Sequence, residues 1–245
     1  MRNFEVNPNE IKPLPAEFFK GDVEVVAEAL IGKFLFTVDD DGTCTGGQII
    51  ETEAYDQNDP AAHCYFADGK RPPSLGAADA MFGLHGTAYV YQTSSGCCLN
   101  FVTGSEGFGS AVLIRALKPT NGIQKMRLRH KDHYEAPWLK DDQKYLFRLC
   151  QGPVLMCVAL GVKGALNEAL LAQPPFKLGS LLDSSSKIVV GPRVRAERTI
   201  EKNAQKSPIH PMLKNYAKER HWRFVDWGAK EFVSEPRYPL YARVV

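Results

Sequence analysis

Short apolar runs separated by turn residues organise the 245 residues of this chain. Runs rich in branched and aromatic residues predict strands, because these side chains pack well on a pleated surface. The predicted strands cover residues 33–38, 47–55, 87–92, 97–103, 112–117, 187–194 and 222–225. The turn sequence Thr93-Ser94-Ser95-Gly96 connects two of them and therefore predicts a protruding β-hairpin.

Apolar residues at helical spacing predict helices elsewhere. Val23, Val26 and Leu30 would share one face of a helix that Asp22 caps and Gly32 ends. Further helices are expected over residues 121–130, from about residue 142, and from residue 153. No repeat or linker divides the chain. The pattern therefore predicts a single α+β domain over residues 1–245, with a predominantly antiparallel, curved sheet and surrounding helices.

The end of the strand at residues 47–55 carries the first candidate chemistry. Side chains alternate between the two faces of a strand, so Glu51, Glu53 and Tyr55 should share one face, and His63 follows in the next loop. These groups can form an acid–base cluster. They can equally belong to a solvated edge strand whose acids face water, which is the commoner arrangement of Glu and Tyr.

Arg115 lies inside the apolar strand predicted over residues 112–117. A lone buried charge is costly, so Arg115 requires an acidic partner. The partner is either an unrelated acid elsewhere in the fold or the same site that contains Glu53.

Charge is distributed unevenly along the chain, although the net charge is only +2. Residues 1–60 hold 13 acidic and 4 basic side chains, a balance of −9, whereas residues 191–223 hold 9 basic and 3 acidic ones, a balance of +6. Such asymmetry predicts a face for a polyanion such as nucleic acid. The alternative is that the basic segment only keeps the surface soluble.

Cysteine and histidine spacing argues against a metal centre. The six cysteines include no Cys-x-x-Cys pair and form no disulfide framework, so we expect free thiols and a reducing compartment. His130 and His133 could ligate a metal from one helix face, but no third ligand accompanies them. No apolar run is long enough to span a bilayer, and residues 1–5 do not resemble a signal peptide. We expect a prokaryotic cytoplasmic, nucleoid-associated protein.

Several motifs in a fixed order resemble one enzyme family, the alkyladenine (3-methyladenine) or methylpurine-DNA glycosylases, over residues 14–234. The motifs are Glu51-Thr52-Glu53-Ala54-Tyr55, Ala62-His63, Met81-Phe82, Gly86-Thr87-Ala88-Tyr89-Val90-Tyr91, Leu99-Asn100, Leu113-Ile114-Arg115-Ala116-Leu117-Lys118-Pro119, Gly152-Pro153, Gly191-Pro192-Arg193-Val194 and Trp222-Arg223-Phe224. The resemblance implies a monofunctional hydrolase of base excision repair that flips alkylated or deaminated purines out of DNA.

The resemblance also implies residue roles. Glu53 would be the general base that activates water against the sugar, and Arg115 and the backbone carbonyl of Val194 would hold that water. The purine would bind to Tyr55, His63, Tyr91 and Asn100, with the two tyrosines on its faces and Asn100 excluding guanine. DNA contacts would come from Thr93, Ser94, Arg193 and Arg195. No metal or organic cofactor is implied, and the partner would be damaged DNA, duplex or single-stranded, bound by a monomer.

The hairpin tip departs from the family pattern. Family members usually carry a Tyr there that enters the minor groove, whereas residues 92–96 are polar and shorter here. The usual Thr-x-Arg-Asn run near residues 69–79 and the usual lysine after residue 153 are also missing. We therefore expect weak base flipping. Alternatives are a DNA-binding member of the same fold with little or no turnover, a bifunctional lyase and a nucleoside hydrolase.

Overall fold

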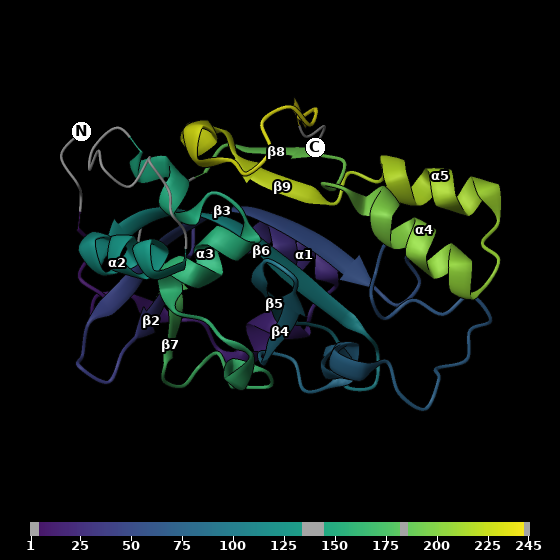
Figure 1. The fold of residues 1–245 in the computed structure, drawn as a ribbon, viewed down its shortest axis with the longest axis horizontal. Helices are drawn as coiled ribbons and strands as arrows, with labels where there is room; N and C mark the ends of the chain where they lie inside the picture. The colour runs from purple at the N-terminus through teal and green to yellow at the C-terminus, as the bar shows by residue number, and fades with distance from the viewer. Residues whose placement is uncertain (1–4, 134–144, 182–185, 243–245) are drawn as a thin grey trace.

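The computed structural model describes residues 5–133, 145–181 and 186–242 (Figure 1). One open sheet of ten strands, in which every paired neighbour is antiparallel, forms the centre of this part of the chain. Its strands are β1 (Lys12–Pro13), β2 (Phe34–Val38), β3 (Cys44–Asp56), β4 (Ala88–Thr93), β5 (Gly96–Val102), β6 (Ser110–Asn121), β7 (Phe176–Ser180), β8 (Ile188–Gly191), β9 (Arg223–Asp226) and β10 (Tyr241–Ala242). The predicted α+β fold with an antiparallel sheet and a β4–β5 hairpin is confirmed.

Helices surround this sheet. The α-helices are α1 (Val23–Ala29), α2 (Ile123–His133), α3 (Pro153–Leu160), α4 (Ala196–Lys206) and α5 (Pro211–Glu219). Short 3-10 helices are η1 (Ala16–Lys20), η2 (Gly76–Phe82), η4 (Leu146–Cys150), η5 (Gly164–Leu166) and η6 (Trp227–Phe232). The main apolar core packs α1 and α3 against β3, β5 and β6.

Strand β3 is hydrogen-bonded along both of its edges. Strand β6 pairs with it from Gly46 to Asp56, while β2 takes the other edge over Cys44–Gln48 and β9 takes it over Glu51–Glu53. Glu51 and Glu53, which lie within this doubly paired stretch, are fully buried. The interpretation of this segment as a solvated edge strand is wrong, because strands from distant parts of the sequence cover both edges.

Helices α4 and α5 lie side by side beyond the end of the sheet (Figure 1). The apolar pattern did not predict them, because the buried side of α4 contains only Ala196, Ile200 and Asn203. The strand predicted over residues 187–194 ends early, at Gly191. Arg195 then adopts a left-handed conformation, with φ of 58°, and the chain turns into α4. The start of the helix expected near residue 142 lies outside the described residues.

Candidate active site

Glu53 is the buried centre of the candidate site and accepts three hydrogen bonds. The hydroxyl of Tyr55 donates to its Oε2 at 2.8 Å, and Nη1 of Arg115 donates to the same oxygen at 3.1 Å. The backbone N–H of Val194 donates to Oε1 at 2.6 Å. Donors from β3, β6 and the loop after β8 therefore fix the carboxylate in one orientation, and each bond is strengthened by the charge of the acceptor.

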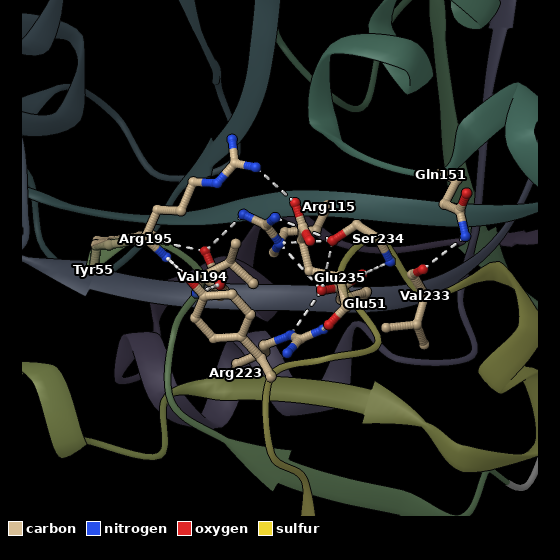
Figure 2. A network of polar contacts seen from close by, with 12 residues as sticks. Glu51, Tyr55, Arg115, Gln151, Val194, Arg195, Arg223, Val233, Ser234 and Glu235 are labelled. Atoms are coloured by element: carbon tan, nitrogen blue, oxygen red, sulfur yellow. Dashed lines mark hydrogen bonds and ion pairs between the residues drawn. The ribbon is translucent and has the colours of Figure 1, made fainter. Parts of the chain in front are cut away.

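A second acid, Glu51, holds the arginine in place. Nε of Arg115 donates to Glu51 at 3.1 Å, and Nε of Arg223 donates to the same oxygen at 2.8 Å. The N–H and hydroxyl of Ser234 add bonds of 2.7 and 2.9 Å (Figure 2). Burial acts to raise the pKa of Glu51, but Arg115 and Arg223 bring it below its usual value. Arg115 thus joins the two buried carboxylates, and its acidic partners belong to the candidate site.

Burial and the neighbouring charge of Glu53 raise the pKa of Tyr55 well above its ordinary value. Tyr55 therefore stays protonated at neutral pH and can donate its hydrogen bond to Glu53. The guanidinium of Arg193 also lies 4.7 Å from the centre of the Tyr55 ring. Tyr55 therefore contacts both a carboxylate and a cation.

A cavity of about 450 Å³ opens beside these groups. Residues from β3, β4, β5, β6, the first turn of α3 and the start of α4 contribute to its wall. The lining residues that the sequence had singled out are Tyr55, His63, Tyr91, Thr93, Asn100, Arg115, Val194 and Arg195. Glu53 itself does not line the cavity. Its carboxylate is contacted by three residues that do, namely Tyr55, Arg115 and Val194.

His63 and two tyrosines form an aromatic group in the cavity. The ring centres of His63 and Tyr91 are 4.4 Å apart, and Nδ1 of His63 lies 3.1 Å from the hydroxyl of Tyr89. Asn100 donates from its amide to the carbonyl of Tyr89 at 3.1 Å. Burial first, and then the positive charges of Lys202 and Lys206, lower the pKa of His63 to about 4. His63 is therefore neutral at pH 7.

The low pKa of His63 predicts a loss of stability in mild acid. An unfolded histidine titrates near 6.5, so between pH 6.5 and 4 the unfolded chain binds a proton that the folded chain does not. The free energy of unfolding should therefore fall by about 2 kcal/mol from pH 7 to pH 5 on account of this group. Urea unfolding at both pH values measures the loss. Between pH 7 and pH 5, the free energy of unfolding of the variant His63→Gln should fall by about 2 kcal/mol less than that of the unaltered protein. An equal fall in both proteins would contradict the prediction.

The hairpin that carries Tyr91 and Asn100 has a polar turn. Ser94 is exposed at this turn, and Thr93 bonds back to the carbonyl of Gly96 at 2.7 Å. Gly96 has a φ of 137°, and a Cβ there would come within 2.8 Å of the Val154 side chain. The turn therefore packs directly on the first turn of α3, which closes one side of the cavity.

The structure corrects the role expected for Arg193. Its side chain is buried and pairs with Asp59 rather than facing the surface. It also donates to the carbonyls of Ala54 and Ala217, at 2.9 and 3.0 Å. Arg193 therefore cannot contact DNA from the surface; it joins β3 to α5. Arg195, in contrast, is half-exposed, lines the cavity and pairs with Glu235 at 2.9 Å.

Several site residues had no signal in the sequence pattern. Tyr89 and Arg223 were visible only as parts of family motifs, and both Arg223 and Ser234 reach Glu51 from more than 170 positions away. For Val194 the sequence predicted a role of the carbonyl, whereas the observed bond to Glu53 uses the N–H. The role of the carbonyl stays a prediction.

The described residues contain no cluster of three or more His, Cys, Asp or Glu side chains that could hold a metal ion. Nε2 of His130 donates to the carbonyl of Leu149 at 2.8 Å. All six cysteines are free thiols. In the same described ranges, no helix is long and apolar enough to cross a membrane.

Comparison with known proteins gives consistent matches. The family model described as methylpurine-DNA glycosylase matches residues 17–229. A protein of Rhodopseudomonas palustris is 38% identical over 224 residues, which cover 91% of each chain. One from Granulibacter bethesdensis is 38% identical over 77% of this chain and 80% of its own, and one from Methanoculleus marisnigri is 39% identical over 68% and 78%. All three are named "Putative 3-methyladenine DNA glycosylase".

Proposed function

Because the chain belongs to the methylpurine-DNA glycosylase family, we propose that it is a monofunctional DNA glycosylase that removes alkylated or deaminated purines. The damaged nucleotide rotates out of the duplex into the cavity, and water cleaves the N-glycosidic bond while the DNA backbone stays uncut. One observation carries this proposal. Tyr55, Arg115 and Val194 line the cavity on one side and hold the Glu53 carboxylate on the other.

The cavity suits a single purine. Its volume of about 450 Å³ lies in the range of sites for small ligands. Tyr55, His63 and Tyr91 present aromatic rings, which stack on any purine face. An N-alkylated purine carries a positive charge, and an aromatic face attracts a cation. Asn100 completes the polar part of the wall and can discriminate between purine edges.

Hydrogen-bond accounting supports an attacking water at one of the two carboxylate oxygens of Glu53. Each carboxylate oxygen accepts about two hydrogen bonds. Oε2 of Glu53 already accepts hydrogen bonds from Tyr55 and Arg115, whereas Oε1 accepts one only from the N–H of Val194 among the described residues. Oε1 therefore has one acceptor position left for a water molecule. Glu53 would take a proton from this water, and its charge would stabilise the oxocarbenium-like sugar.

A glycosylase assay tests the proposal. Oligonucleotides with one hypoxanthine or ethenoadenine, and alkylated DNA that contains 3-methyladenine, would be incubated with the protein and then treated with alkali to cut at abasic sites. We expect base release from at least one substrate and no covalent adduct on borohydride trapping, because the proposed nucleophile is water. Binding to damaged or single-stranded DNA without base release would instead support a binding protein with little or no turnover.

The polar hairpin turn predicts inefficient flipping from duplex DNA. Without an apolar or aromatic wedge, little fills the gap that an extruded base leaves. Excision of the same lesion should be faster from single-stranded than from duplex DNA. Ser94→Tyr, which places a ring at the exposed turn, should raise the duplex rate several-fold relative to the single-strand rate, and Ser94→Ala should not. A strong duplex preference in the unaltered protein would contradict this expectation.

A further inference from the structure

Helix α4 carries a row of exposed basic side chains, which we call the α4 basic stripe. It consists of Arg195 at the N-cap, Arg198, Lys202 and Lys206. Their spacings of three, four and four residues place them on one side of a helix with 3.6 residues per turn. The acidic side chains of the same helix, Glu197 and Glu201, fall at spacings that place them on another side. The stripe is therefore a continuous line of positive charge.

The orientation of this stripe is fixed relative to the candidate active site. Ala196, Ile200 and Asn203 form the buried side of α4. The Asn203 side chain donates to the carbonyls of Pro60 and Ala62, at 3.0 and 2.9 Å. These carbonyls belong to the loop that leads into His63. Helix α4 is therefore attached to the same loop that places His63 in the cavity.

The stripe begins at the cavity and leads away from it. Arg195 and Arg198 line the cavity, together with Thr199. Lys202 and Lys206 lie one and two turns further along α4, still close enough for their charges to lower the pKa of His63. From residue 195 to residue 206 a helix rises about 16 Å. This length is several times the axial rise of 3.4 Å per nucleotide of one DNA strand, so the stripe is long enough to follow the backbone beyond a single nucleotide.

The charges of the stripe are largely unneutralised by the protein. Arg195 pairs with Glu235 at 2.9 Å but remains half-exposed. Across the described ranges, no ion pair involves Arg198, Lys202 or Lys206. Exposed cations in a line attract a polyanion, and they release its counterions when it binds.

Resting on the proposed function, we propose that the α4 basic stripe binds the backbone phosphates of the DNA strand that carries the damaged nucleotide, on one side of the extruded base. Arg195 and Arg198 hold the phosphates next to the cavity, and Lys202 and Lys206 hold those further along the strand. This proposal assigns a ligand to part of the basic segment 191–223.

The salt dependence of DNA binding tests this assignment. The probe is a fluorescein-labelled 25-base-pair duplex with one tetrahydrofuran abasic-site analogue, titrated between 50 and 200 mM salt. The double variant K202Q/K206Q should make the slope of log K against log salt shallower by about 1.8, since each phosphate contact contributes about 0.9.

The matched control is K214Q/K218Q on α5. It removes the same charge, but these lysines face a groove with Ile200 and Glu201 between the two helices. Its slope should equal that of the unaltered protein. An unchanged slope in K202Q/K206Q, or the same change in both variants, overturns the assignment. If the slope shifts as expected while the unaltered protein releases no base, the phosphate contact stands and the glycosylase proposal fails.

Discussion

Replacing Glu53 with glutamine should lower the single-turnover rate of base excision by roughly 10²–10⁴-fold, the usual contribution of a general base. Glutamine keeps the size of the side chain but cannot take a proton from water. DNA binding should change only a few-fold, because Glu53 is fully buried behind the cavity wall. Rates from excess protein on lesion-containing DNA, together with Kd from fluorescence anisotropy, measure both quantities.

Glu235→Gln is the matched control for this substitution. Glu235 lines the same cavity and pairs with Arg195 rather than with Arg115. The change removes the same charge, and excision should remain within a few-fold of the unaltered rate. If Glu53→Gln retains a normal rate while the control behaves as expected, another group activates the water and our mechanism is wrong.

Replacing Arg115 with leucine should lower the free energy of unfolding by about 3–5 kcal/mol, because it removes the cation between two buried carboxylates. Arg195→Leu, a half-exposed arginine with one ion pair, should cost about 1 kcal/mol or less. Urea unfolding at pH 7 compares the two variants. Equal and small effects would show that Arg115 does not stabilise the buried acids.

The Arg115 variant should also respond differently to acid. In the unaltered protein the pKa of Glu51 is lowered on folding, so the resulting stability is present above the ordinary value of 4.5 and is lost as pH falls below it. Without Arg115 the lowering is smaller, and only Arg223 remains as an ion-pair partner of Glu51 within the described chain. The variant should therefore lose less stability than the unaltered protein between pH 6 and pH 3.

The sequence predicted the parts of the site that depend on local spacing. The two-residue period of a strand placed Glu51, Glu53 and Tyr55 on one face, and the rule that a buried charge needs a partner made their site one of two candidate partners for Arg115. Turn residues correctly placed the β4–β5 hairpin. These features follow from a few neighbouring residues, which a sequence displays directly.

The rest depends on contacts between distant segments. The pairing of β9 with β3, which brings Arg223 to Glu51, depends on a segment more than 170 positions away. Arg193 was expected to contact DNA, yet in the folded chain it is buried and pairs with Asp59 and the carbonyl of Ala217. Helix α4 lacks an apolar repeat that would predict a helix. Its buried side contains one large apolar residue, Ile200, and Asn203 holds it to the loop before His63 through two hydrogen bonds.

The first turn of α3 has a consequence for how substrate choice can evolve. Gln151, Pro153, Val154 and Leu155 face the cavity from outside the sheet, and none of them contacts Glu53. Glu53 lies in a strand that is hydrogen-bonded along both edges, whereas this part of the wall comes from the start of a helix outside the sheet. Under the proposed function, substitutions in this segment would change which purines fit the cavity and leave the contacts of Glu53 intact, so related proteins could share one reaction and differ in substrate.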